Sequence, residues 1–79
     1  MNQIVQNIAQ FKRKYKELVH ELVQVRKQSN TNQEQMAAWL NVNRRKIIQF
    51  EGLKKVNMEL LLLYGDKLSV DIKLNFEIN

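Results

Sequence analysis

The sequence predicts a mainly α-helical domain with a single β-strand at its C-terminal end. Apolar residues recur at spacings of three and four over most of the chain, which is the pattern of amphipathic helices. From Ser69 to Asn79 the pattern changes to strict alternation of apolar and polar residues, which is typical of a strand with one buried face. Three polar clusters, at 29–32, 41–43 and 52–57, divide the helical part into four pieces.

The composition sets the broad class of protein. With 79 residues the chain forms one small domain, residues 1–79, and a domain of this size buries too little surface to be more than marginally stable alone. It contains no cysteine, so neither disulfides nor thiolate metal sites can stabilise it. Oligomerisation is therefore the expected source of additional stability. It has neither a membrane-length apolar run nor a secretory signal, so we expect a cytoplasmic protein.

The first helix is predicted from about Asn2 to Gln28. Its apolar stripe has the regular three and four spacing that suits packing on a globular body. A coiled coil would also use this spacing, but the flanking charges offer it little support and additional valines widen the stripe. The stripe consists of Met1, Ile4, Ile8, Phe11, Tyr15, Leu18, Leu22 and Val25.

Three shorter helices are predicted to follow, and each begins at an asparagine. Asn32 is a good N-cap and forms a capping box with Gln35, while Asn43 and Asn57 cap the next two helices. The expected buried residues are Met36, Ala37 and Leu40 in the second helix, Ile47 and Phe50 in the third, and Leu60, Leu61 and either Leu63 or Tyr64 in the fourth. Gly65 is expected to weaken the last turn of the fourth helix.

The C-terminal strand, residues 69–79, needs a partner for its backbone hydrogen bonds. No other segment alternates in the same way, so the strand is predicted to pair with its own copy across a twofold axis. Its apolar face, and with it the dimer interface, consists of Val70, Ile72, Leu74, Phe76 and Ile78. Pairing centred on Asn75 would place Lys73 opposite Glu77 twice, and a shorter pairing about Ile72 is the alternative.

The segment from Asn32 to Gly52 carries the strongest functional signal. Two short helices are separated by three residues, which is a helix-turn-helix arrangement. Asn41 occupies the turn position that usually requires a left-handed backbone, where asparagine is the best substitute for glycine. Val42 is expected to fill the turn.

Over residues 18–70 the chain resembles the Cro/C1-type, lambda-repressor-like (XRE) helix-turn-helix family. The resemblance rests on residue type and spacing at Leu22, Val25-Arg26-Lys27, Gln33, Met36-Ala37, Leu40, Val42, Ile47, Phe50-Glu51-Gly52, Leu60 to Leu63 and Leu68-Ser69-Val70. The chain departs from the pattern at Asn41, in lacking one residue before Gly52, and in its extra N-terminal residues, 1–15. Antitoxin-type repressors, in which a similar strand pairs across a dimer, resemble it most. The resemblance implies a homodimer that binds double-stranded DNA at a palindromic site.

The third helix is the expected reader of the DNA sequence. With Ile47 and Phe50 pointing inward, its geometry directs a different set of side chains outward into the major groove. The predicted base-contacting residues are Arg44, Arg45, Ile48 and Gln49, and the predicted phosphate-contacting residues are Asn43, Lys46, Lys54 and Lys55. Gln33 resembles the phosphate-contacting glutamine of the family.

The formal charge of +5 agrees with an anionic partner, because much of the positive charge lies between residues 43 and 55. A second basic cluster, Lys12, Arg13, Lys14 and Lys16, is interpreted as the solvated face of a helix. Trp39 is either part of the core edge or the receptor for apolar residues of the extra N-terminal segment, from this chain or a partner's.

An enzyme is not expected. Glu17, His20 and Glu21 provide only half of a carboxylate di-metal site, and a solvated face is the favoured interpretation. The chain has no cysteine and no glycine-rich phosphate loop, and only His20 could serve as an imidazole base, so we expect neither catalysis nor a cofactor. The alternative function is a protein-interaction module, such as an antitoxin that neutralises a toxin, with DNA binding secondary or absent.

Overall fold

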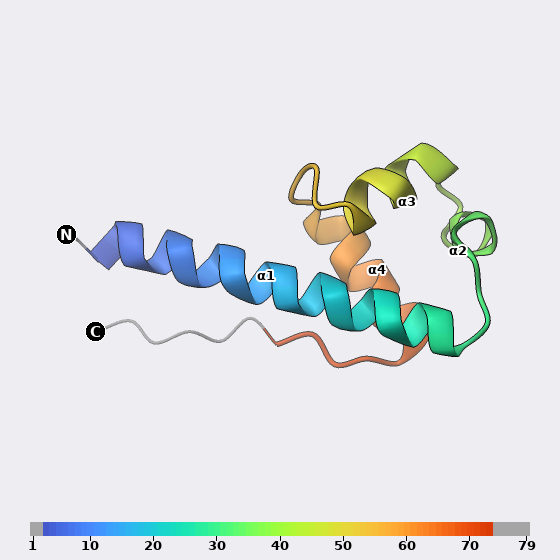
Figure 1. Ribbon diagram of the computed structural model, residues 1–79, viewed down its shortest axis with the longest axis horizontal. Coiled ribbons are helices and arrows are strands. Elements are labelled where there is room, and N and C mark those ends of the chain that lie inside the picture. The colour runs from blue at the N-terminus through green and yellow to red at the C-terminus, as the bar shows by residue number, and fades with distance from the viewer. Residues whose placement is uncertain (1–2, 74–79) are drawn as a thin grey trace.

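The computed structural model describes residues 3–73, and the side chains from residue 7 onward. It contains four helices: α1 (Gln3–Gln28), α2 (Gln33–Leu40), α3 (Arg44–Glu51) and α4 (Met58–Leu68). No strand lies within the described residues, so the mainly α class is confirmed for that part of the chain. Figure 1 shows α2, α3 and α4 gathered on the C-terminal half of α1, while its N-terminal half projects beyond them.

The helix starts predicted from the sequence are confirmed. The Asn32 side chain accepts a hydrogen bond from the Gln35 N–H at 2.8 Å, and the Gln35 side chain accepts one from the Asn32 N–H, which completes the capping box. Asn43 caps α3 through the Lys46 N–H at 3.1 Å, and Asn57 caps α4 through the Leu60 N–H at 3.0 Å. These caps fix where α2, α3 and α4 begin.

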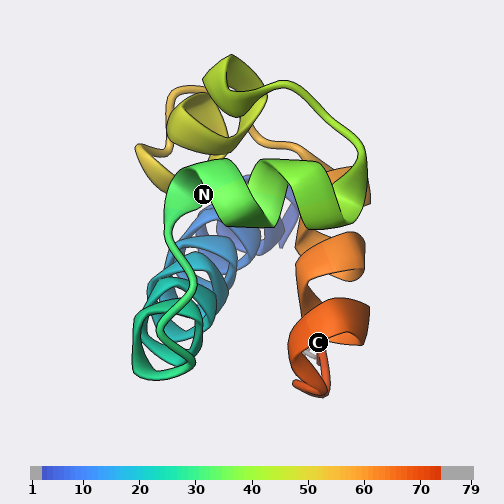
Figure 2. The same ribbon diagram turned by 90° about the vertical axis from the view of Figure 1, so that its right-hand side faces the viewer.

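The turn between α2 and α3 has the predicted left-handed residue. Asn41 has φ 56° and ψ 45°, and its N–H contacts the carbonyls of Ala37 and Ala38. The Val42 N–H then donates to the Ala37 carbonyl at 3.0 Å, so the last turn of α2 is closed from both positions. Figure 2 shows the outcome, with α3 leaving the end of α2 and crossing above it.

The core lies where all four helices meet. Its members are buried apolar side chains: Tyr15, Leu18, Val19, Leu22, Met36, Ala37, Ile47, Phe50, Leu60, Leu61 and Tyr64. Tyr15, Phe50 and Tyr64 form an aromatic line, with ring centroids 6.4 Å apart for the first pair and 4.7 Å for the second. This line joins α1, α3 and α4, so α3 is packed on two other helices rather than resting on one.

Some predicted details of the helices are wrong. Ile8 is 51% exposed, and the N-terminal half of α1, to which it belongs by its number, projects beyond the other helices (Figure 1). Leu40 is only half-buried. Of the two alternatives given for the buried face of α4, Tyr64 is buried and Leu63 is half-buried. Gly65 lies within α4, which continues to Leu68, and the weakening of the last turn stays a prediction. Met1 and the side chain of Ile4 lie outside the described part.

The C-terminal segment also differs from the prediction where it is described. Ser69 is not the first strand residue but the left-handed C-cap of α4, with φ 58° and its N–H directed at the Gly65 and Asp66 carbonyls. After it, Val70 and Ile72 are half-buried against the core, whereas Asp71 and Lys73 are exposed. The predicted alternation is therefore present in residues 70–73 without a strand. Leu74, Phe76, Ile78 and the rest of 74–79 lie outside the described residues.

Candidate functional site

The outer face of α3 is the first element of the site. Ile47 and Phe50 are almost completely buried, which fixes the rotation of the helix about its axis. The opposite face presents the exposed side chains of Arg44, Arg45, Lys46, Ile48 and Gln49, and Ile48 is 45% exposed. The structure thus brings all four predicted base-contacting residues together on the surface of one short helix.

The charges of α3 are unfavourable for the helix itself. Its first turn carries no acidic residue but three cations, Arg44, Arg45 and Lys46, next to the positive end of the helix dipole. Each such cation costs about 0.3–1 kcal/mol at an exposed position. Within residues 7–73 the structure contains one ion pair, between Arg26 and Glu51, so no acid neutralises these cations. The first turn of α3 is therefore strongly cationic at some cost to the stability of the helix.

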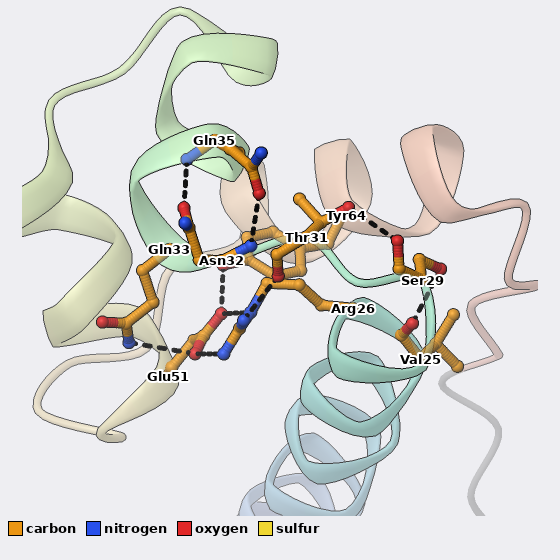
Figure 3. A network of polar contacts seen from close by, with 9 residues as sticks. All are labelled: Val25, Arg26, Ser29, Thr31, Asn32, Gln33, Gln35, Glu51 and Tyr64. Carbon is orange, nitrogen blue, oxygen red and sulfur yellow. Dashed lines mark hydrogen bonds and ion pairs between the residues drawn. The ribbon is translucent and has the colours of Figure 1, made fainter.

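Glu51, the only acid of α3, is turned away from the outer face. Figure 3 shows its carboxylate at the centre of a polar network. Arg26 Nε and Nη2 donate to it at 2.7 and 2.8 Å, a bidentate pair whose side chains are both only 7% exposed. The Tyr64 hydroxyl donates at 2.5 Å and Gln33 Nε2 at 3.1 Å.

The same network joins the four helices around the end of α3. Arg26 comes from α1, Gln33 from α2 and Tyr64 from α4, and Arg26 Nη1 also donates to the Thr31 carbonyl at 2.7 Å. The three residues that donate hydrogen bonds to Glu51 therefore come from three different helices (Figure 3). The network orients α3 relative to the rest of the domain, and with it the outer face that carries the arginines.

The network shifts the pKa of its members. Burial alone would raise the pKa of Glu51, but the hydrogen bonds from Arg26, Tyr64 and Gln33 and the positive charge of Arg26 outweigh burial and lower it. The hydrogen bond to Glu51 raises the pKa of Arg26, and burial raises the pKa of Tyr64. At neutral pH the ion pair is therefore fully charged and the phenol is neutral.

Gln33 and Ile48 lie on one open groove of about 620 Å³ between the end of α1, the start of α2 and α3. The groove also contains Lys27 and the Arg26–Glu51 pair. One amide hydrogen of Gln33 is used by Glu51, so the second is free to donate outward. The predicted phosphate-contacting glutamine therefore lies on the same groove as a predicted base-contacting residue of α3.

The remaining predicted phosphate contacts flank α3 on its other side. Lys54 and Lys55 are exposed in the loop that connects α3 to α4. A cleft of about 140 Å³ contains Lys46 and Gln49 of α3 together with Lys55. Asn43 is exposed at the N-cap of α3. Its side-chain oxygen accepts the capping hydrogen bond from the Lys46 N–H, which leaves the side-chain NH2 group for another partner.

Trp39 lies on the exposed flank of α2 and not in the core. Its side chain is 53% exposed, and the Lys67 ammonium group is 5.9 Å from its ring centroid. Phe11 packs with Tyr15, at a centroid distance of 6.0 Å, so it is held on the core edge. Of the two interpretations made from the sequence, packing of Trp39 as ordinary core edge is wrong, and contact with a partner's segment stays a prediction.

Sequence reasoning missed the Arg26–Glu51 pair. A signal existed, because Arg26 lies four residues after Leu22 on the buried face of α1, and Glu51 is the only acid among many cations from Asn43 to Lys55. Sequence reasoning also missed a cleft that joins α1 to the loop after α3, described below. In the part of the chain that the structure describes, no helix is long and apolar enough to cross a membrane.

Comparisons with known proteins found no matching family model, curated protein or solved structure. The candidate site is therefore defined by the geometry and charge of the chain itself. Its three elements are the cationic outer face of α3, the buried network that orients this helix, and the groove and loop on either side of it.

Proposed function

We propose that the protein is a sequence-specific DNA-binding regulator, acting as a repressor or autoregulator, that binds a palindromic site as a homodimer. The observation that carries the proposal is the outer face of α3, where two arginines, a glutamine and an isoleucine are exposed and, within residues 7–73, neither arginine forms an ion pair. The side chains match chemical groups in the major groove. No residue of the site is assigned a catalytic role, and the protein is proposed to be a non-enzyme.

Each exposed side chain of α3 has a use against base edges. Arg44 and Arg45 can each hold guanine O6 and N7 in a bidentate fork, and Gln49 can hold adenine N6 and N7 in the same way. Ile48 can contact a thymine methyl group. A helix of this length presents its first turns to the groove, where the two arginines lie.

The flanking residues supply contacts to the DNA backbone. Gln33, with Lys27 across the groove, is placed for one phosphate strand, and Lys46, Lys54 and Lys55 for the other. The three-residue turn between α2 and α3, with its left-handed Asn41, supports the proposed helix-turn-helix. This turn supports the resemblance to lambda-repressor-like regulators.

The dimer is proposed to form through the C-terminal segment. Val70 and Ile72 already lie against the core, so the apolar face of residues 70–73 is directed inward and the polar face outward. Because Ser69 caps α4 and residues 70–73 form no strand, the proposed ribbon is limited to two copies of the residues after Lys73, with Leu74, Phe76 and Ile78 as further interface residues. Two α3 helices about 34 Å apart would then reach successive major grooves.

The proposal is tested by selecting bound duplexes from a random DNA pool at low and at high salt. Recovery of a palindromic sequence, with affinity that falls steeply as salt rises, is the expected result. Recovery of no common sequence, or binding that hardly depends on salt, would exclude the proposed function.

Replacing Gly65 with alanine tests whether the C-terminal segment packs against α4. A Cβ atom at this position would lie 2.5 Å from Ile72 Cγ1 and 2.9 Å from the Val70 carbonyl oxygen. Alanine normally stabilises a helix relative to glycine by about 1 kcal/mol, but here the segment must move, which costs about 1–3 kcal/mol. We expect no gain in the free energy of unfolding and a weaker dimer, measured by urea unfolding and sedimentation equilibrium.

The matched control is Asp66→Ala, because Asp66 is the next residue of α4 and is exposed. It should leave dimerisation unchanged. A Gly65→Ala variant that is more stable than the parent and dimerises equally well would show that residues 70–72 do not lie on α4 in the dimer.

A second candidate function is a protein-interaction module, for example an antitoxin. It is favoured by the exposed apolar residues outside the α3 surface, chiefly Ile8 on the projecting part of α1 and Leu62 on α4, which are 51% and 55% exposed. The two functions are distinguished by charge reversal on α3, which removes DNA binding without touching these residues.

A further inference from the structure

A basic cleft joins the middle of α1 to the loop between α3 and α4. It has a volume of about 390 Å³, and its lining residues are Lys12, Tyr15, Lys16, Leu53, Lys54, Lys55 and Val56. Two lysines come from each side, and no acidic residue lines the cleft. Figure 1 shows the loop standing over α1 at this point. The α1 cluster is therefore not only a solvated helix face, because two of its four members line one cleft with the loop lysines.

The cleft continues the surface of α3. Lys55 and Val56 line both this cleft and the smaller one that contains Lys46 and Gln49 of α3. A row of cations therefore extends from the outer face of α3, across the loop, to Lys12 and Lys16 on α1. Within residues 7–73 none of these lysines forms an ion pair, so their mutual repulsion is relieved only by solvent or by an anionic partner.

The position of α1 in this row is fixed by the core. The Tyr15 hydroxyl accepts a hydrogen bond from the Asn57 N–H at 2.9 Å, which ties α1 to the end of the loop. The ring of Tyr15 is buried edge-on against Phe50 of α3, and burial raises the pKa of its hydroxyl. The α1 backbone that carries Lys12 and Lys16 is therefore fixed relative to α3.

We propose that Lys12 and Lys16 form, with Lys54 and Lys55, a second backbone contact that holds DNA phosphates beyond the groove read by α3. The inference rests on the proposed function and extends it to the N-terminal segment. The apolar floor of Tyr15, Leu53 and Val56 supports the aliphatic stems of the lysines while their ammonium groups reach the phosphates. Such contacts add affinity and salt dependence, but no base preference.

The test compares two variants that each lose two positive charges. Lys12→Gln/Lys16→Gln removes the α1 side of the cleft, whereas Arg13→Gln/Lys67→Gln removes two exposed cations that do not line it. Arg13 is a close control because it lies on the same helix, about 100° around the axis from Lys12. All four side chains of the variants are exposed, so both proteins should fold, which circular dichroism and urea unfolding would verify.

Binding to a labelled mixed-sequence duplex is measured by fluorescence anisotropy at KCl concentrations between about 50 and 200 mM. For the Lys12→Gln/Lys16→Gln variant, the cleft variant, we expect the slope of log K against log[KCl] to become shallower by about 1.8. Each lost phosphate contact reduces the magnitude of this slope by about 0.9. Affinity at about 100 mM KCl should fall tenfold or more for this variant. The control should keep the parent's slope.

The outcomes separate the two proposals. If the parent binds DNA with a steep salt dependence but the cleft variant behaves like the control, the proposed backbone contact is wrong and the proposed function stands. If the parent does not bind the duplex at any salt concentration, both fail. If both variants lose the same slope, the charges act through the general field of the protein and the specific contact is wrong.

Discussion

Replacing Glu51 with glutamine is expected to lower the free energy of unfolding by about 3–5 kcal/mol, the usual result of breaking one half of a buried ion pair. The substitution keeps the shape of the side chain but removes its charge. Arg26, only 7% exposed at its side chain, would then remain buried without a counter-charge. Tyr64 and Gln33 would also lose the carboxylate that now accepts their hydrogen bonds.

This loss is large relative to the total stability of the domain. A chain of 79 residues has a free energy of unfolding of about 4–12 kcal/mol, at roughly 0.05–0.15 kcal/mol per residue. Urea unfolding of parent and variant measures the difference. Glu21→Gln is the matched control, because Glu21 is exposed on α1, and it should change stability by less than about 0.5 kcal/mol. Equal stability of the Glu51 variant and the control would contradict the role assigned to the network.

The pH dependence of unfolding provides a second measurement on the same variant. The folded state lowers the pKa of Glu51, whose unfolded value is about 4.3, so the unfolded chain binds more protons in acid. The contribution of ionised Glu51 to the free energy of unfolding is therefore fully present above about pH 4.3. It is lost as the pH falls through the lower pKa that Glu51 has in the folded state. The parent should lose stability in this acid range more steeply than Glu51→Gln, which has no carboxyl group at the position.

The parts of the fold that depend on local chemistry could be predicted from the sequence. Asn32, Asn43 and Asn57 cap their helices because an asparagine side chain satisfies free N–H groups wherever it precedes a helix. Asn41 adopts the left-handed conformation for an equally local reason. The rotation of α3 followed from Ile47 and Phe50, so the exposed positions of its predicted base-contacting residues followed as well.

The parts that depend on contacts between distant segments could not be predicted in the same way. Arg26 and Glu51 are 25 residues apart, and a charged pair has no periodicity that would reveal its burial. Lys12 and Lys16 have the pattern of an ordinary solvated helix face, and only the loop above them makes them part of a cleft. Val70 and Ile72 alternate as a strand would, but they lie on α4 because Gly65 leaves room for them.

Reversing the charge of Arg44 and Arg45 is expected to abolish sequence-specific DNA binding. If each arginine makes one bidentate contact to guanine, the two contacts are worth about 2–6 kcal/mol, and the new glutamates would add repulsion from the phosphates. We therefore expect the affinity for the selected duplex to fall at least about 30-fold. The matched control is charge reversal of Arg13 and Lys67, which changes the net charge equally but leaves α3 intact.

The stability of the Arg44→Glu/Arg45→Glu variant distinguishes a functional surface from a structural one. Both arginines are exposed in the first turn of α3, where positive charge opposes the helix dipole and negative charge favours it, by about 0.3–1 kcal/mol for each residue. The free energy of unfolding should therefore stay the same or rise while DNA binding is lost. A variant that loses both would mean that the arginines support the fold. A variant that still binds the duplex, or that loses DNA binding yet keeps its cellular effect, would favour the protein-interaction module instead.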